Sequence, residues 1–139
     1  MKSSKTYMLE IITPSEVIFK EKIVYARIPG ISGYLGILYG HAPLVTAMTV
    51  GEIKIQLSGD EFKYFATSGG MLEILKKKVI ILAENAEEAR SIDLDRAVSA
   101  KERAEKRLKQ NIPDINLNRA RFALVKALNR IKIKNSLYR

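Results

Sequence analysis

The sequence Ser91-Ile92-Asp93-Leu94-Asp95-Arg96-Ala97 marks the point at which the hydrophobic pattern of the chain changes. Before it, apolar residues recur with a period of two, as in β-strands, and after it they recur with a period near 3.6, as in helices. Ser91 and Asp93 carry side-chain oxygens that can accept from the free N–H groups of a first helical turn, and Asp95 places negative charge near the positive end of the helix dipole. The stretch therefore predicts a helix start, with sheet before it and helices after it.

Length and composition are those of a small globular protein. The 139 residues suffice for one compact domain, or for one domain with an appendage, and 47% of them are hydrophobic. No apolar run approaches the roughly 20 residues of a membrane-spanning helix. The N-terminal residues lead directly into a strand pattern instead of an apolar signal core. We therefore expect a soluble protein that is not processed at its N-terminus.

The chain has no cysteine and a single histidine, His41. Disulfides, a thiolate nucleophile, a zinc knuckle and most histidine-based metal sites are thereby excluded, which fits a cytosolic compartment. One histidine does not define a catalytic triad, and the glycine-rich stretch that precedes it lacks the lysine and hydroxyl of a P-loop. We expect no metal site and no catalytic residues, and we interpret His41 as a hydrogen-bonded loop residue.

Positive charge is concentrated in the last third of the chain. The formal net charge is +9, of which residues 92–139 contribute +8, from 13 basic and 5 acidic side chains. The first 91 residues contribute only +1. An anionic partner is therefore expected to bind the C-terminal part.

Residues 1–90 show many short apolar stretches separated by turn residues. The clearest alternation begins at Gly51, where Ile53, Ile55 and Leu57 alternate with polar residues, as in a strand with one solvated face. Glycines recur through 30–40, so we interpret 31–41 as a tight loop with one short strand piece. The predicted strands are 7–12, 17–19, 23–28, 35–38, a strand from Gly51, 62–67, 71–75 and 79–83. This pattern favours an antiparallel flattened β-sandwich or barrel.

Residues 91–139 predict two helices. Asn111-Ile112-Pro113-Asp114 ends the first, and the short link requires the helices to lie antiparallel. The fold class is therefore α+β, with a β-sandwich domain over 1–90 and a two-helix hairpin over 91–139. Because such a hairpin buries one thin seam, it is a candidate moving part. The apolar stripes are Leu94, Ala97, Val98, Ala104 and Leu108 in the first helix, and Leu117, Ala120, Leu124, Ala127, Leu128 and Ile131 in the second.

Basic residues recur on one face of each predicted helix. Arg96 and Arg103 are seven residues apart, and Lys126 and Arg130 are four apart, so each pair shares a face. Two such faces across a hairpin would bind a polyphosphate or an acidic protein segment. The simpler interpretation is a solvated basic surface.

A basic binding module for nucleic acid or an acidic protein is thus one functional hypothesis. Nucleic acid is the weaker ligand of the two, because only Phe122 and Tyr138 are available in this region for base stacking. An enzyme would need a cleft with titratable groups that the sequence does not indicate.

Four motifs resemble the ε subunit of bacterial F-type ATP synthase. They are Gly33-Tyr34-Leu35-Gly36-Ile37-Leu38-Tyr39-Gly40-His41-Ala42-Pro43-Leu44, Ser68-Gly69-Gly70-Met71-Leu72-Glu73, residues 79–84, and Ile92-Asp93-Leu94-Asp95-Arg96-Ala97. The last is similar to the I-D-x-x-R-A motif of nucleotide-binding members of this family. Tyr39 stands where the family usually has proline, which should loosen the loop without changing the fold.

The resemblance implies a non-catalytic rotor subunit at the cytoplasmic face of the bacterial plasma membrane, peripheral to the membrane. The sandwich would bind the γ subunit beside the c-ring, with Tyr34 and His41 as contacts. The hairpin would lie folded on the sandwich or extend along γ toward the α and β subunits, and the extended form would inhibit ATP hydrolysis. The complex would couple proton or sodium transport to ATP synthesis, and no nucleic acid partner is expected.

The resemblance also implies a regulatory ATP site, with no cofactor required. Ile92, Asp93, Arg96 and Ala97 match the motif of ATP-binding members, and bound ATP would stabilise the folded hairpin. Lys126 stands where those members carry arginine, and a lysine keeps the charge but loses the planar fork. The supporting contacts carried over by position are Glu87, Arg103 and Arg130.

Overall fold

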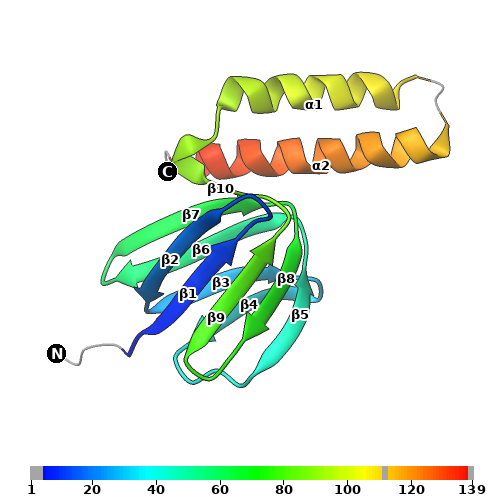
Figure 1. The fold of residues 1–139 in the computed structure, drawn as a ribbon. Coiled ribbons are helices and arrows are strands. Elements are labelled where there is room, and N and C mark those ends of the chain that lie inside the picture. Colours follow the sequence, from blue (N-terminus) through cyan, green and yellow to red (C-terminus); the bar gives the residue numbers. More distant parts are fainter. Residues whose placement is uncertain (1–4, 111–112, 138–139) are drawn as a thin grey trace. The chain divides into compact units, whose positions relative to one another are not determined.

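The computed structural model describes residues 5–110 and 113–137 (Figure 1). The predicted link at 111–112 and the terminal Tyr138 and Arg139 lie outside the described residues. The chain divides between Glu88 and Ala89 into two compact units. The first unit is built from strands and the second from helices, so the α+β class is confirmed.

The first unit is a nearly closed β-sandwich whose ten described strands form one sheet folded on itself. The strand order is β10-β7-β6-β3-β5-β8-β9-β1-β2, and β4 pairs with β3. The described pairs are antiparallel except β1 with β9, which run parallel from Met8 opposite Lys78 to Ile12 opposite Leu82. The strands are β1 (Tyr7–Ile12), β2 (Val17–Ile23), β3 (Tyr25–Gly30), β4 (Gly33–Leu38), β5 (Leu44–Met48), β6 (Gly51–Ser58), β7 (Glu61–Thr67), β8 (Gly70–Ile74), β9 (Lys78–Ala83) and β10 (Ala86–Glu88).

The strand piece predicted at 35–38 is confirmed, but the strand β4 begins two residues earlier, at Gly33. β4 pairs with β3 along its whole length, from Tyr25 opposite Leu38 to Gly30 opposite Gly33. The backbone ladder does not depend on side chains, and the glycines allow the turn. Gly33 has a φ of 126°, and a Cβ at Gly30 would lie 2.8 Å from the Gly33 carbonyl oxygen.

Two strands were not predicted, and two were misplaced. β5 and β10 are short, and neither alternates cleanly between buried and exposed side chains. β2 continues through the charged residues 20–22, which suit a strand at the edge of the sheet. β3 consequently begins and ends two residues later than expected.

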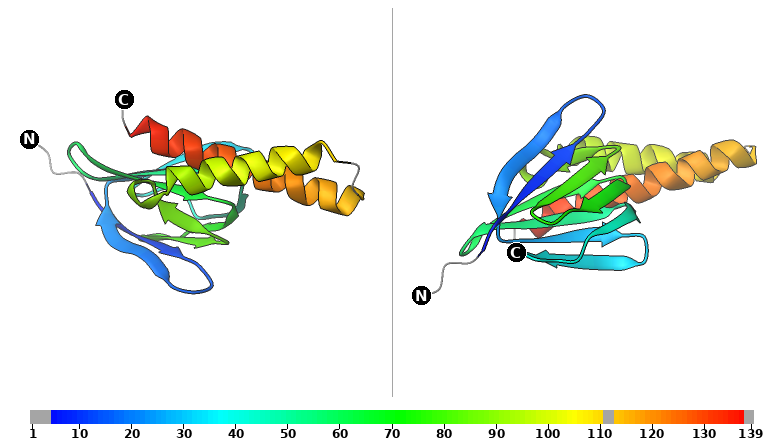
Figure 2. Two further views of the ribbon diagram at one scale, coloured as in Figure 1. Left: turned by 90° about the horizontal axis from the view of Figure 1, so that it is seen from above. Right: turned by 60° about the horizontal axis from the view of Figure 1, so that its bottom comes forward.

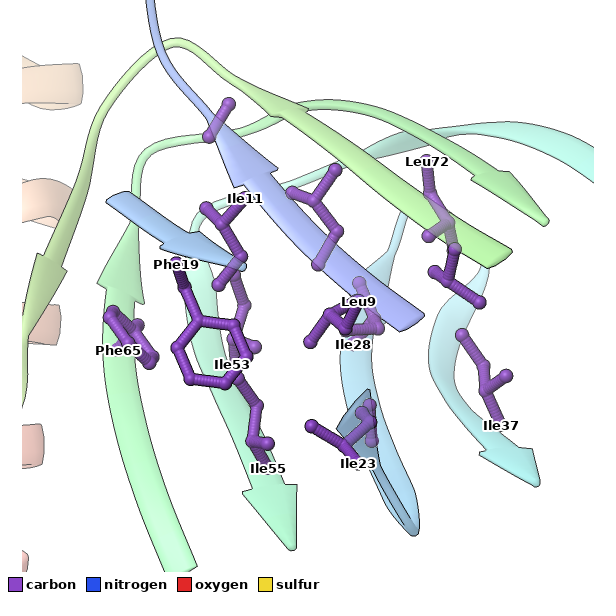
Figure 3. Packing of buried hydrophobic residues seen from close by; sticks show 14 of the residues in the cluster. Leu9, Ile11, Phe19, Ile23, Ile28, Ile37, Ile53, Ile55, Phe65 and Leu72 are labelled. Carbon is purple, nitrogen blue, oxygen red and sulfur yellow. The ribbon is translucent and has the colours of Figure 1, made fainter. Parts of the chain in front are cut away.

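The core lies between the layers of the sandwich (Figure 3). Ile53 and Ile55 are fully buried, as the alternation in β6 predicts, whereas Lys54 between them is only partly covered. Phe19 and Phe65 pack edge to face, with ring centroids 5.8 Å apart and an interplanar angle of 72°. Other core residues include Leu9, Ile11, Ile23, Ile28, Ile37, Leu72, Ile74 and Ile81.

Tyr7 is the core residue with a buried polar group. Its hydroxyl donates to the carbonyl oxygen of Ile37 at 2.7 Å and thereby ties β1 to β4. Burial raises the pKa of the Tyr7 phenol well above its usual value. The phenol therefore stays protonated in the folded protein at pH values where it ionises in the unfolded chain.

The second unit consists of a 3₁₀ turn, η1 (Ala89–Ser91), and the helices α1 (Leu94–Leu108) and α2 (Asp114–Ser136). The helices run antiparallel and side by side in all views (Figure 2). Four alanines on the predicted stripes are buried, and their small side chains allow close approach of the helices. They are Ala97, Ala104, Ala120 and Ala127.

The predicted burial of one residue in the second apolar stripe was wrong. Leu128 is 45% exposed, and Phe122 and Val125 on the same helix are exposed as well. Successive residues of a helix point about 100° apart. Because Ala127 is buried, Leu128 is turned away from the side of α2 that Ala127 occupies.

The buried Tyr7 phenol predicts a loss of stability at alkaline pH. Since the folded-state pKa is the higher one, its contribution is present below about pH 10 and decreases as pH rises further, by at most about 1.4 kcal/mol per pH unit. In Tyr7→Phe the Ile37 carbonyl loses its partner, so the variant should be less stable at pH 7 by about 1–3 kcal/mol. Above pH 10 the difference in free energy of unfolding between the wild type and Tyr7→Phe should decrease, as measured by urea unfolding at each pH. Tyr39→Phe, at an exposed position, is the control, and a gap that stays constant to pH 11 would contradict the assignment.

Candidate functional site

The helical unit begins at an N-cap on Asp93. The backbone of Asp93 is extended, with φ −83° and ψ 104°, and its Oδ1 accepts from the Arg96 N–H at 3.1 Å. The Asp93 carbonyl oxygen accepts from the Ala97 N–H at 3.0 Å. The predicted helix start is therefore confirmed, but Ser91 does not cap it and belongs to η1 instead.

The matched motif at 92–97 divides into buried and solvent-facing residues. Ile92 and Ala97 are 2% and 0% exposed, so both anchor the start of α1 through packing. Asp93 and Arg96 are exposed. Asp93 uses its Oδ1 to cap α1, so Arg96 is the motif residue that offers a cationic side chain to a ligand.

Arg96 and Arg103 line one open groove along the solvent face of α1, together with Asp95 and Ser99. Its volume is about 270 Å³. The groove brings together two guanidinium groups, which can bind phosphate oxygens in a bidentate manner, and one hydroxyl donor. Asp95 would repel an anion at its end of the groove but can accept from a sugar hydroxyl.

The other predicted ligands of ATP do not line this groove. Lys126 and Arg130 lie on α2 and are partly buried, and the Lys126 ammonium lies 4.8 Å from the centroid of the Phe122 ring. Glu87 lies in β10, opposite Ala66 of β7. The roles of these three residues in ATP binding stay predictions.

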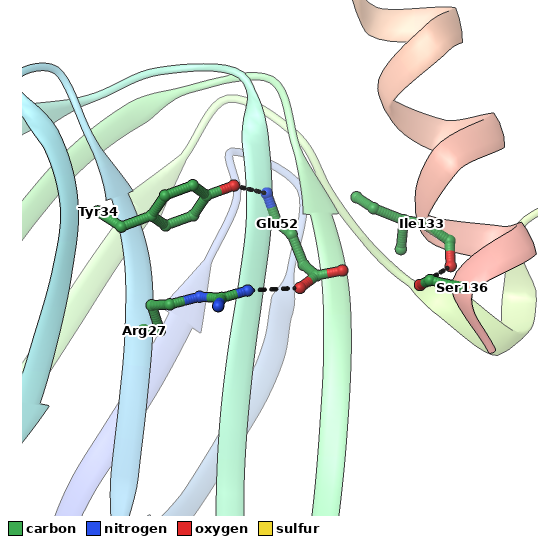
Figure 4. Close-up of polar contacts among 5 residues, drawn as sticks. All are labelled: Arg27, Tyr34, Glu52, Ile133 and Ser136. Carbon is green, nitrogen blue, oxygen red and sulfur yellow. Dashed lines mark hydrogen bonds and ion pairs between the residues drawn. The ribbon is translucent and has the colours of Figure 1, made fainter. Parts of the chain in front are cut away.

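Lys134 closes the base of the helical unit. Its ammonium donates to the Arg90 carbonyl oxygen at 2.8 Å, which ties the end of α2 to η1. Ser136 caps the same end, where its hydroxyl donates to the Ile133 carbonyl oxygen at 2.7 Å (Figure 4). Lys134 was not among the predicted functional residues, because one lysine among many gives no signal for a contact with a residue 44 positions away.

The two predicted rotor contacts lie on β4 and in the loop after it. Tyr34 is 55% exposed. His41 is half-buried, and its Nδ1 lies 2.8 Å from the Ala42 carbonyl oxygen, so this nitrogen is the donor. The predicted hydrogen-bonded loop position of His41 is therefore confirmed. Ile31, Leu38 and Tyr39 are also exposed in this segment and make its surface apolar.

In residues 5–110 and 113–137, no helix has the length and apolar character needed to cross a membrane. The same part of the chain contains no group of three or more histidine, aspartate or glutamate side chains placed to hold a metal ion.

Two family models cover almost the whole chain in succession. The β-sandwich domain of the ATP synthase delta/epsilon chain matches residues 6–89, and the long α-helix domain of the same chain matches residues 90–135. Together they account for both units of the structure.

Full-length relatives agree with these matches. The ATP synthase epsilon chain of Desulforamulus reducens is 48% identical over 129 residues, covering 93% of this chain and 97% of the relative. The epsilon chain of Syntrophomonas wolfei is 43% identical over 130 residues, covering 94% and 95%. A chain of the Euglena gracilis mitochondrial ATP synthase shares the fold with a TM-score of 0.80 at 20% identity, covering 93% of this chain and 81% of that one.

These matches define a non-catalytic subunit of a rotary ATP synthase, so the expectation that the chain is not an enzyme is confirmed. The chain belongs to the ATP synthase delta/epsilon family, and the bacterial relatives named above are epsilon chains.

The N-cap predicts a specific stability effect. Asp93→Ala should destabilise the helical unit by about 1 kcal/mol, because the Arg96 N–H loses its acceptor. Asp93→Asn keeps an oxygen at this position, so its free energy of unfolding should stay within a few tenths of a kcal/mol of the wild-type value. Urea unfolding followed by circular dichroism at 222 nm measures the difference. Asp95→Ala removes a first-turn charge without removing the cap and should cost only a few tenths of a kcal/mol. Equal losses in all three variants would rule out the cap.

Proposed function

We propose that this chain is the ε subunit in the central stalk of a bacterial F-type ATP synthase. The sandwich binds γ and lies beside the c-ring, at the cytoplasmic face of the membrane, with Tyr34 and His41 among its contacts. The observation that carries the proposal is the match of both family domains, in order, across residues 6–135. As part of the rotor, the subunit couples ion transport to ATP synthesis, and the ring supplies the site for the proton or sodium ion.

The hairpin is the regulatory part of the proposed subunit. Extended along γ toward α and β, it inhibits ATP hydrolysis. Its charge supports this role, because the +8 of residues 92–139 suits an acidic segment of a partner, and opposite charges steer docking and hold its register. The thin alanine seam supports it as well, since a hairpin with little buried surface can change state at low cost.

ATP is the proposed regulatory ligand. The groove on α1 presents Arg96 and Arg103 to phosphate oxygens, and Ser99 adds a hydroxyl. If ATP binds only the folded hairpin, mass action shifts the hairpin toward that state and relieves inhibition as ATP rises. Lys126 and Arg130 are the proposed contacts from α2.

The test is addition of the full chain to an α3β3γ complex prepared without this subunit. The chain should bind with a 1:1 stoichiometry and lower ATP hydrolysis severalfold at low ATP, with less inhibition at high ATP. In Arg103→Gln, inhibition should persist to higher ATP, because the ligand no longer stabilises the folded hairpin. Arg121→Gln, an exposed arginine of α2 outside the groove, is the charge-matched control.

Two results would contradict the proposal. One is failure of the chain to bind α3β3γ. The other is binding that disappears between about 50 and 200 mM salt, as expected of a basic module held only by charge.

A further inference from the structure

Three outward-facing residues on three adjacent strands form a cluster on the sandwich. Tyr34 lies on β4, Arg27 on β3 and Glu52 on β6 (Figure 4). The family motifs include only Tyr34, and neither the proposed coupling nor the proposed inhibition uses Arg27 or Glu52.

The cluster holds the Tyr34 side chain at two points. The Arg27 guanidinium lies 4.9 Å from the centroid of the Tyr34 ring, within the range of a cation–π contact. The Tyr34 hydroxyl accepts from the backbone N–H of Glu52 at 3.5 Å, a long hydrogen bond. Arg27 is in turn fixed by an ion pair with the Glu52 carboxylate, with 2.9 Å between Nη2 and Oε1.

Two further features restrict this arrangement. A Cβ at position 51 would lie 2.7 Å from Cβ of Pro29 and 3.3 Å from the Tyr34 hydroxyl oxygen, so a larger residue there would displace Pro29 and crowd Tyr34. The Nε of Arg27 is buried and has no hydrogen-bond acceptor in the described part of the chain. The aromatic ring beside the guanidinium partly offsets that desolvation.

We propose that Arg27 and Glu52 are positioning residues that hold Tyr34 in the conformation in which it contacts the rotor partner. The inference rests on the proposed function, which makes Tyr34 a contact of γ or the c-ring. A tyrosine that is 55% exposed would otherwise populate several rotamers, and ordering it on binding costs conformational entropy. The cluster fixes the ring before the partner arrives, so that its remaining exposed surface is preorganised.

If the cluster only stabilised the fold, its loss would lower the free energy of unfolding more than the affinity for the partner. Ion pairs that are partly exposed contribute little to folding stability, and the Arg27 side chain is 38% exposed. Loss of the cluster should therefore affect partner binding more than unfolding. It should also change the magnetic environment of Arg27, because the guanidinium lies beside an aromatic ring.

The experiment compares Arg27→Met, Arg27→Lys and Glu52→Gln as full chains. Affinity for α3β3γ should fall about three- to tenfold in Arg27→Met and Glu52→Gln, with the midpoint of thermal unfolding nearly unchanged, and Arg27→Lys should recover part of the loss. In the free wild-type chain, the Arg27 Nε–H resonance should shift when Tyr34 is replaced by leucine. Lys63→Met is the matched control, because it removes a lysine that lies 5.8 Å from the Phe19 ring, outside the cluster.

The outcomes separate the inference from the proposed function. If the wild-type chain binds α3β3γ and both Arg27→Met and Glu52→Gln bind it with the same affinity, the inference is overturned and the proposed function stays intact. Equal losses of affinity in Lys63→Met and Arg27→Met also overturn the inference. An Arg27 Nε–H chemical shift that does not change in Tyr34→Leu overturns it as well. Failure of the wild-type chain to bind overturns both.

Discussion

The hydrogen bond from the Arg96 N–H to the Asp93 carboxylate determines where the chain changes from sheet to helix. Every position of α1 follows from that starting point, since each residue along a helix is turned by about 100°. With the cap on Asp93, Ala97 and Ala104 are buried, whereas Arg96 and Arg103 line the solvent face. A start shifted by one residue would turn the two faces and bring charge toward the buried side. One local contact thus decides both how the hairpin packs and what it offers to a ligand.

The two units differ in how they are stabilised, and this difference underlies the division of roles that we propose. The sandwich has a continuous core of large aliphatic side chains and paired aromatic rings. The hairpin buries mainly alanines, and Lys134 holds its base through one exposed hydrogen bond to the Arg90 carbonyl. The free energy gained by burying apolar side chains scales with the area buried, so the sandwich is the more stable unit. A stable sandwich joined to a less stable regulatory hairpin suits a subunit that must stay bound while one part of it changes conformation.

Local patterns predicted the parts of the structure that depend on local physics. The alternation in β6 and the oxygen acceptor of Asp93 act within a few residues, so the strand and the helix start could be read directly. The parallel pairing of β1 with β9, the contact of Lys134 with Arg90 and the cluster around Tyr34 join residues that are distant in sequence, and no periodicity encodes them. The start of β4 was predicted two residues too late, because the glycines favour a loop and the pairing with β3 is not visible in the local pattern.

We propose that the capped start of α1 builds a phosphate-binding face on a hairpin that responds to ATP. Calorimetric titration of the full chain with ATP measures this binding, with Arg96→Gln and Arg103→Gln as variants and Arg121→Gln as control. We predict saturable binding with a dissociation constant between micromolar and low millimolar, about −8 to −4 kcal/mol. Binding should be lost in both groove variants and kept in the control. The absence of binding heat in the wild-type chain up to several millimolar ATP, or equal binding by all four proteins, would contradict the claim.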